Sequence, residues 1–241
     1  MKIDKKKFDD RQLAEIKKGK KHGLSKKEIL LYAKPDFDNY KMRLIRKALE
    51  GGLAYKKALV LVNPLLDFYQ ILEIIDAYNK GVSLEFARKY ATGDFDSNQL
   101  KEIFKGYEHG LSEEEISKYA KVEFYYYEMW LMRLGYEKGF DEEKITLYTD
   151  RRFSQGQMYQ IYKGVKHGLD LKQVKVYAKE EFDENQMLII RLCLEEGYSP
   201  DEINFDKIVT VDTLDDNYTQ FLDTDVILEE FSQVRKKTLK K

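Results

Sequence analysis

The stretch FDSNQLKEIFKGYEHGLSEEEISKYAKVE, residues 95–123, returns 58 residues later as FSQGQMYQIYKGVKHGLDLKQVKVYAKEE, residues 153–181. The pattern starts every 29 residues, at Phe8, Phe37, Leu66, Phe95, Phe124, Phe153 and Phe182. Fifteen residues after each start stands a glycine, at Gly23, Gly52, Gly81, Gly110, Gly139, Gly168 and Gly197. Self-similarity at one fixed period is the signature of repeat architectures, so we predict seven copies of one structural unit.

Each repeat is predicted to form two helices. The first begins at an N-cap aspartate, and a glutamine three residues later completes a capping box: Asp9, Asp38, Asp67, Asp96 and Asp183 are the caps, and Gln12, Gln70, Gln99 and Gln186 the partners. Its buried face follows from apolar residues spaced three apart: Leu13/Ile16, Met42/Ile45, Ile71/Ile74, Leu100/Ile103, Met129/Met132, Met158/Ile161 and Met187/Ile190. The repeated glycine is typical of a left-handed helix C-cap.

A second, shorter helix is predicted to start two residues after that glycine. Its N-caps are Ser25, Ser83, Ser112, Asp141, Asp170 and Ser199. A small residue recurs near the end of each first helix, at Gly19, Ala48, Ala77, Gly106, Gly135, Gly164 and Cys193. Because glycine costs about 1 kcal/mol of helix propensity relative to alanine, these positions indicate close approach by another helix.

Helices this short are marginal on their own in water, so the copies must stack to bury their apolar faces. We therefore predict an all-α fold: an α-solenoid of about seven 29-residue helix-turn-helix repeats over residues 1–203. The period stops near residue 204. Residues 204–241 are expected to form an acidic capping tail that ends in a short helix.

Composition bounds the function. The 241 residues carry a net charge of −1, which gives no bulk attraction to nucleic acid or to an anionic membrane. The charge is nevertheless segregated, with eleven Lys/Arg against four Asp/Glu in residues 1–27 and twelve Asp/Glu against Lys207 alone in residues 195–230. A single cysteine, no apolar leader and no stretch of about 18 apolar residues favour a cytoplasmic protein without a membrane span.

The repeat pattern FDxxQMxxIxxGxxxGLSxxxIxxYAKPEF resembles the short helical repeats of accessory proteins from phages and conjugative elements in Gram-positive bacteria. It covers residues 8 to about 203, and FDDRQLAEIKKGKKHGLSKKEILLYAKPDF matches it well. Lys41, Glu128 and Tyr125 depart from it. The resemblance implies no catalytic residues, and it implies a mobile-element setting, such as inhibition of a bacterial defence complex of the anti-CRISPR or anti-restriction type.

No catalytic, metal or cofactor motif is apparent, so we expect a protein that is not an enzyme. His22, His109 and His167 share one repeat position and lie too far apart in the chain to hold one metal. We interpret them as polar side chains at the negative ends of helices. Cys193 occupies a small-residue position, where core packing accounts for it.

A second stripe on the first helix, at the third, seventh and tenth positions of each repeat, changes its chemistry from copy to copy. Aromatic and Arg side chains are enriched at binding hot spots. The candidate partner-binding residues are Phe104, Tyr126, Trp130, Arg133, Tyr159 and Tyr162. Packing between repeats is an equal alternative for this stripe. The aliphatic residues 58–75 are either a self-association surface or a buried middle.

The leading hypothesis is a protein-binding repeat module. The alternative is nucleic-acid binding by the basic N-terminal end, or imitation of nucleic acid by the acidic run with Asp212, Asp215, Asp216, Asp223 and Asp225.

Overall fold

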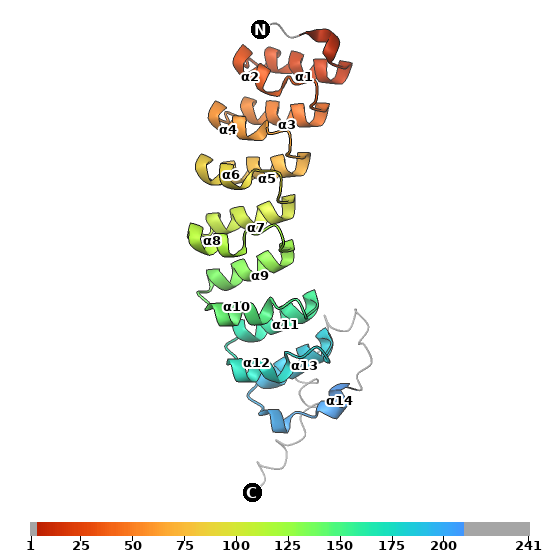
Figure 1. Cartoon of the computed structure of the whole chain (residues 1–241), viewed down its shortest axis with the longest axis vertical. Helices are drawn as coiled ribbons and strands as arrows, with labels where there is room; N and C mark the ends of the chain where they lie inside the picture. The colour runs from red at the N-terminus through yellow and green to blue at the C-terminus, as the bar shows by residue number, and fades with distance from the viewer. Residues whose placement is uncertain (1–3, 210–241) are drawn as a thin grey trace. The chain divides into compact units, whose positions relative to one another are not determined.

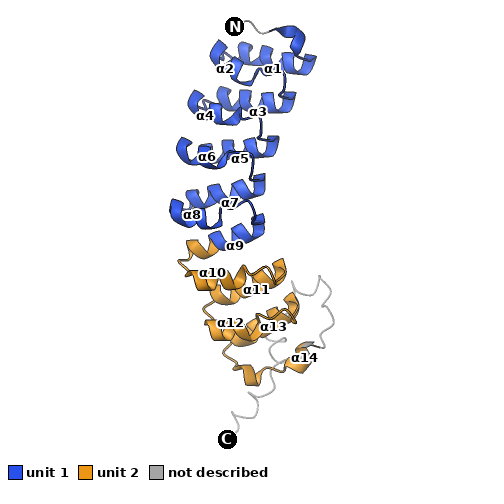
Figure 2. Ribbon diagram, in the orientation of Figure 1, with its two compact units in different colours: residues 1–133 blue, residues 134–241 orange. Residues whose placement is uncertain are grey.

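The computed structural model describes residues 4–209, whose regular elements are all helices (Figure 1). Two compact units, residues 1–133 and 134–241, divide the chain (Figure 2). Unit 1 holds a 3-10 turn (Lys5–Lys7) and then α1 (Asp10–Lys21), α2 (Lys26–Tyr32), α3 (Asn39–Glu50), α4 (Tyr55–Leu61), α5 (Phe68–Asn79), α6 (Leu84–Tyr90), α7 (Ser97–Glu108) and α8 (Glu113–Tyr119). The division falls inside α9 (Tyr126–Glu137). Unit 2 continues with α10 (Glu142–Tyr148), α11 (Gln155–Lys166), α12 (Leu171–Tyr177), α13 (Glu184–Glu195), a 3-10 turn (Pro200–Glu202) and α14 (Phe205–Val209).

Within each unit, a long helix of one repeat packs against the long helix of the next. In unit 1, α1 packs on α3, α3 on α5 and α5 on α7, while the short helices α2, α4 and α6 follow one another beside them. In unit 2, α11 packs on α13. The all-α prediction is therefore confirmed. A continuous solenoid of seven repeats stays a prediction.

The helix boundaries follow from the predicted caps. Each of the five aspartates named above accepts a hydrogen bond from the backbone of its own helix, and the four glutamines complete their capping boxes. All seven repeated glycines have positive φ, between 67° and 95°, which only a residue without a Cβ adopts at little cost. The cap pattern was thus readable from the sequence alone.

The predicted buried stripe is also found. From Met42 through Ile190 its members are fully buried, apart from the half-buried Met132. Leu13 and Ile16 of α1 are half-buried as well. The second helix adds a tyrosine to the core in five repeats, namely Tyr32, Tyr90, Tyr119, Tyr148 and Tyr177.

Four of these tyrosines explain the glycines among the small residues. A Cβ built on Gly19, Gly106, Gly135 or Gly164 would overlap the hydroxyl of the tyrosine from the paired short helix. In three of the pairs that hydroxyl donates to a backbone carbonyl of the long helix, as Tyr119 Oη does to Glu102 O at 3.3 Å. Close approach was predicted correctly, and a side chain of the same repeat makes it.

The capping glutamines also tie each repeat to the next one. The Nε2 atoms of Gln12, Gln70, Gln99 and Gln157 each donate, at 2.6 Å, to the carbonyl of the residue that opens the following repeat. Lys41, which breaks the sequence pattern, makes the same link from Nζ to Leu66 O at 2.7 Å. Glu128 keeps the capping half of the role and accepts the N–H of Tyr125. One side chain therefore caps a helix and fixes the neighbouring repeat.

The seventh repeat differs from the others. Ser199 begins the short turn Pro200–Glu202 instead of a second α-helix, and α14 then packs on α13. Phe205 stacks on Phe182, with ring centroids 6.1 Å apart. The rest of the predicted acidic tail, with Asp212 to Asp225 and the final short helix, lies outside the described residues. In residues 4–209 no helix combines the length and the apolar character that a bilayer span requires.

Candidate protein-binding surface

The six predicted binding residues separate into buried and exposed groups. Phe104, Arg133 and Tyr162 are at most 3% exposed, so the prediction that they present a surface to a partner needs correction. Tyr126 and Tyr159 are exposed, and Trp130 is partly exposed. The buried three share the tenth position of the repeat. That position faces a neighbouring helix, which was the alternative reading of the stripe.

Arg133 forms a buried ion pair with the preceding repeat. Its Nε donates to Glu102 Oε2 at 2.8 Å, and both side chains are nearly inaccessible. Arg46 does the same with Glu15 at 2.9 Å, and its Nη1 also reaches Glu50 at 2.6 Å. In unit 2, Arg191 Nε bonds the amide oxygen of Gln160. A residue pair 31 positions apart thus joins two repeats.

The histidines belong to the same clusters. His22 Nδ1 lies 2.9 Å from Glu50 Oε1, and His167 Nδ1 lies 2.9 Å from Glu195 Oε1. These histidines do stand at the ends of their helices, as C-caps. The sequence contains a pattern that indicates these contacts: Arg follows each His by 24 residues and Glu follows it by 28. The histidines are therefore parts of contacts between repeats.

Electrostatics support a structural role for these carboxylates. Burial alone would raise the pKa of Glu15, but hydrogen bonds from Lys18 and Arg46 outweigh burial and hold that pKa below its usual value. Burial likewise opposes Arg46 and His22 at Glu50, whose pKa is also lowered. Both carboxylates therefore stay charged at neutral pH.

Several exposed apolar side chains of unit 1 lie where the long helices begin, whereas Leu59 lies in the short helix α4. Tyr40 of α3 and Tyr69 of α5 occupy the same repeat position on adjacent helices and are 54% and 65% exposed. Leu65, just before α5, and Leu72, one turn into it, are also exposed. We call these four residues the aromatic face. The sequence signal for this face is a tyrosine at the fourth position of the repeat, which lies outside the stripe predicted above.

The beginning of α9 continues this chemistry. Tyr125 and Tyr126 are exposed, and Tyr125 stacks on Tyr127 with ring centroids 6.0 Å apart. Between α5 and α9, the corresponding positions of α7 are polar, with Asn98 and Lys101 exposed. Along unit 1, the same position is therefore aromatic on some helices and polar on others.

The aliphatic residues 58–75 are partly core and partly surface. Leu61, Leu66, Ile71 and Ile74 are buried, whereas Leu65, Tyr69 and Leu72 belong to the aromatic face. The buried-middle reading therefore holds for the first four residues, and self-association through the exposed ones stays a prediction.

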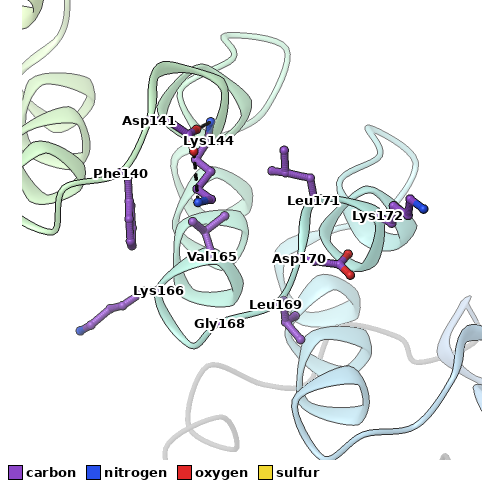
Figure 3. A pocket seen from close by; sticks show the side chains of 10 residues that line it. All are labelled: Phe140, Asp141, Lys144, Val165, Lys166, Gly168, Leu169, Asp170, Leu171 and Lys172. Carbon is purple, nitrogen blue, oxygen red and sulfur yellow. Dashed lines mark hydrogen bonds and ion pairs between the residues drawn. The ribbon is translucent and has the colours of Figure 1, made fainter.

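One surface pocket, about 780 Å³ and open to solvent, lies in unit 2 around Phe140, Val165 and Leu169 (Figure 3). Lys144 at its edge is paired with Asp141 at 3.1 Å. Burial raises the pKa of the Cys193 thiol to about 11, which makes a thiolate nucleophile unfavourable. Among the described residues, no group of three His, Cys, Asp or Glu is placed to hold a metal ion.

Comparison of the chain with protein-family models, curated proteins and solved structures found no match.

Proposed function

We propose that the protein is a non-enzymatic helical-repeat module that recognises another protein through the aromatic face of unit 1. The observation that carries this proposal is the exposure of Tyr40 and Tyr69 at one repeat position, flanked by Leu65 and Leu72. Contiguous exposed apolar groups on a folded surface mark interaction sites, and tyrosine combines a large apolar area with a hydroxyl that stays hydrogen-bonded. This surface suits the desolvated centre of a protein interface.

Three finer statements belong to the same proposal. The repeats form one α-solenoid, the protein works in the cytoplasm, and its partner belongs to a bacterial defence complex that a mobile element inhibits. The contacts repeated within each unit support the first statement, and the sequence resemblance supports the last. Tyr126, Trp130 and Tyr159 remain candidate contacts, because each is at least partly exposed.

The experiment compares two double variants at equivalent positions. Tyr69→Ser with Leu72→Ser removes half of the aromatic face, and Asn98→Ser with Lys101→Ser changes the same positions one repeat later. Affinity purification from a bacterial host, followed by mass spectrometry, should recover a partner with the wild type and the control. We expect the first variant to lose at least about 30-fold in affinity, the effect of truncating a hot spot.

Two results would count against the proposal. One is recovery of ribosomal and chaperone background alone; the other is equal loss of the partner in both variants. Circular dichroism checks that both variants remain folded. All four side chains are exposed, so their replacement should preserve helicity.

A second test asks whether the chain self-associates through residues 58–75. Sedimentation velocity over a range of concentrations would reveal a dimer, and its loss in the Tyr69→Ser/Leu72→Ser variant would assign the aromatic face to a second copy. The alternative function is nucleic-acid binding or mimicry by the charged ends. Only the basic end carries an observation in favour of this alternative.

A further inference from the structure

The turns of the first two helix pairs carry an exposed cluster of lysines. Each pair has its turn between the long and the short helix, α1 to α2 and α3 to α4. Because α1 packs on α3 and α2 on α4, the two turns are neighbours at one edge of unit 1. The lysines stand in the last turn of a long helix or the first turn of a short one. We call this set the lysine edge: Lys20, Lys21, Lys26, Lys27, Lys47 and Lys56, all of them exposed.

Nearby carboxylates do not neutralise this charge, because internal contacts occupy them. Glu50 is bonded to Arg46 and His22. Glu28 accepts the N–H of Ser25 at the N-cap of α2. Within residues 4–209, none of the six lysines forms an ion pair with a carboxylate. The charge of the lysine edge therefore faces solvent.

The edge lacks what a protein or a single-stranded nucleic acid would need. Leu24 and Leu53 of the turns are partly buried, and Lys27 Nζ covers the ring of Tyr55 at 4.1 Å. Protein interfaces need an apolar or aromatic anchor, and single strands need rings on which bases stack. A duplex presents only closely spaced phosphates, about one charge per 1.7 Å, and lysines neutralise them as independent point charges.

The same edge changes sign within unit 1. The positions of Lys26 and Lys27 are occupied in α8 by Glu113 and Glu114, which are exposed; Glu113 pairs with Lys89 of α6 at 3.1 Å. A polyanion would thus be attracted to the first two helix pairs and repelled by the α7–α8 turn. We propose that the lysine edge binds the phosphate backbone of double-stranded nucleic acid, without reading its sequence. This activity is separate from protein recognition by the aromatic face.

Fluorescence anisotropy with a labelled 30-base-pair DNA duplex tests the proposal, using the full chain. The test variant is Lys21→Gln with Lys27→Gln and Lys56→Gln. The control, Lys138→Gln with Lys166→Gln and Lys172→Gln, makes the same charge change at the turns of unit 2. Lys166 and Lys172 are the exact repeat equivalents of Lys21 and Lys27, and all three control lysines are exposed.

We expect duplex binding at 50 mM salt, with the logarithm of affinity falling linearly against the logarithm of salt concentration. The test variant should bind roughly tenfold or more weakly, and its salt slope should be smaller by about 3, one for each lost phosphate contact. The control should stay within about twofold of the wild type. An RNA duplex of the same length shows whether the lysine edge prefers DNA or RNA. Tight binding of either duplex supports the proposal.

Three results would overturn it. The first is no duplex binding at 50 mM salt. The second is equal weakening in both triple variants, which would reduce the effect to net charge. The third is tighter binding of polyglutamate or of single-stranded DNA than of duplex, which would assign the edge to another class of polyanion.

Discussion

At the scale of single residues, a glycine and a tyrosine form one packing unit. Gly106 leaves the space that the Tyr119 hydroxyl needs to reach Glu102 O. In the second repeat the corresponding residues are Ala48 and Leu61, so the methyl group accompanies the missing hydroxyl. In the third repeat Ala77 accompanies Tyr90, whose buried hydroxyl has no hydrogen-bond partner among the described residues. The two positions are therefore expected to depend on each other energetically.

Gly106→Ala should lower the free energy of unfolding by about 1–3 kcal/mol, because the new methyl group overpacks against Tyr119. Adding Tyr119→Leu recreates the Ala48/Leu61 pair and should recover much of that loss. Urea unfolding of the wild type, both single variants and the double variant gives the coupling energy, which we expect to be about 1 kcal/mol or more. Additive losses would show that the two side chains do not share this space.

The buried ion pairs predict a dependence of stability on pH. The pKa values of Glu15 and Glu50 are lowered, so the folded state binds these protons less tightly than the unfolded state does. Their contribution is complete above the ordinary carboxylate value of 4.5 and is lost as the pH falls through the lower folded values. Lowering the pH should therefore protonate Glu15 and Glu50 and so weaken the contact between α1 and α3.

Glu15→Gln tests this and copies a natural arrangement, since Arg191 bonds Gln160 at the equivalent place. The amide keeps an acceptor for Arg46 but loses the charge, so the variant should be about 1–2 kcal/mol less stable at pH 7. Below pH 4 the difference from the wild type should shrink. Urea midpoints measured between pH 3 and pH 7 would reveal this, and a constant difference across that range would contradict the assignment.

At the scale of the element, the capping glutamine couples the start of a helix to the next repeat. Gln70 Oε1 accepts the N–H of Asp67, and Nε2 donates to Phe95 O at 2.6 Å. A residue here must donate to a buried carbonyl, and Lys41 shows that an ammonium group can replace the amide. The side chain at position 70 of α5 must therefore be able to donate a hydrogen bond.

Gln70→Glu should cost about 2–3 kcal/mol, because a carboxylate cannot donate and would face the Phe95 carbonyl. Gln70→Lys should cost less, about 1 kcal/mol, since it loses the acceptor half of the capping box and keeps the donor. Thermal unfolding of the two variants at pH 7 measures the difference. Equal losses would mean that only the cap matters and the link to Phe95 does not.

The elements were predictable because their causes are local in sequence. An N-cap such as Asp96, its partner Gln99 and the glycine at Gly110 act within one repeat, and each was found where the pattern placed it. The surface was harder to predict. Arg133 and Tyr162 have the composition of a binding site, and their burial depends on helices contributed by other parts of the chain. Residue type alone does not reveal the face of a helix that a neighbour covers.

At the scale of the whole molecule, charge and caps distinguish repeats that share one pattern. Residues 4–61 contain 17 Lys/Arg and 8 Asp/Glu, which concentrates positive charge in the first two helix pairs. The last repeat departs in another way, because α14 replaces the helix that would otherwise follow α13. Repeat proteins need such end units, since a terminal repeat has an apolar face without a neighbour.

Truncation tests whether α14 is this end unit. A chain ending at Ile203 loses the stacking of Phe205 on Phe182, the burial of Ile208, and the carbonyl that Gln186 Nε2 bonds at 3.3 Å. A chain ending at Val209 keeps all three. The shorter chain should therefore melt lower by about 5–10 °C, the shift for a loss of about 2–4 kcal/mol in a domain of this size. Identical melting of the two truncated chains would show that α14 does not cap α13, whereas a difference between the Val209 chain and the full chain would measure what residues 210–241 add.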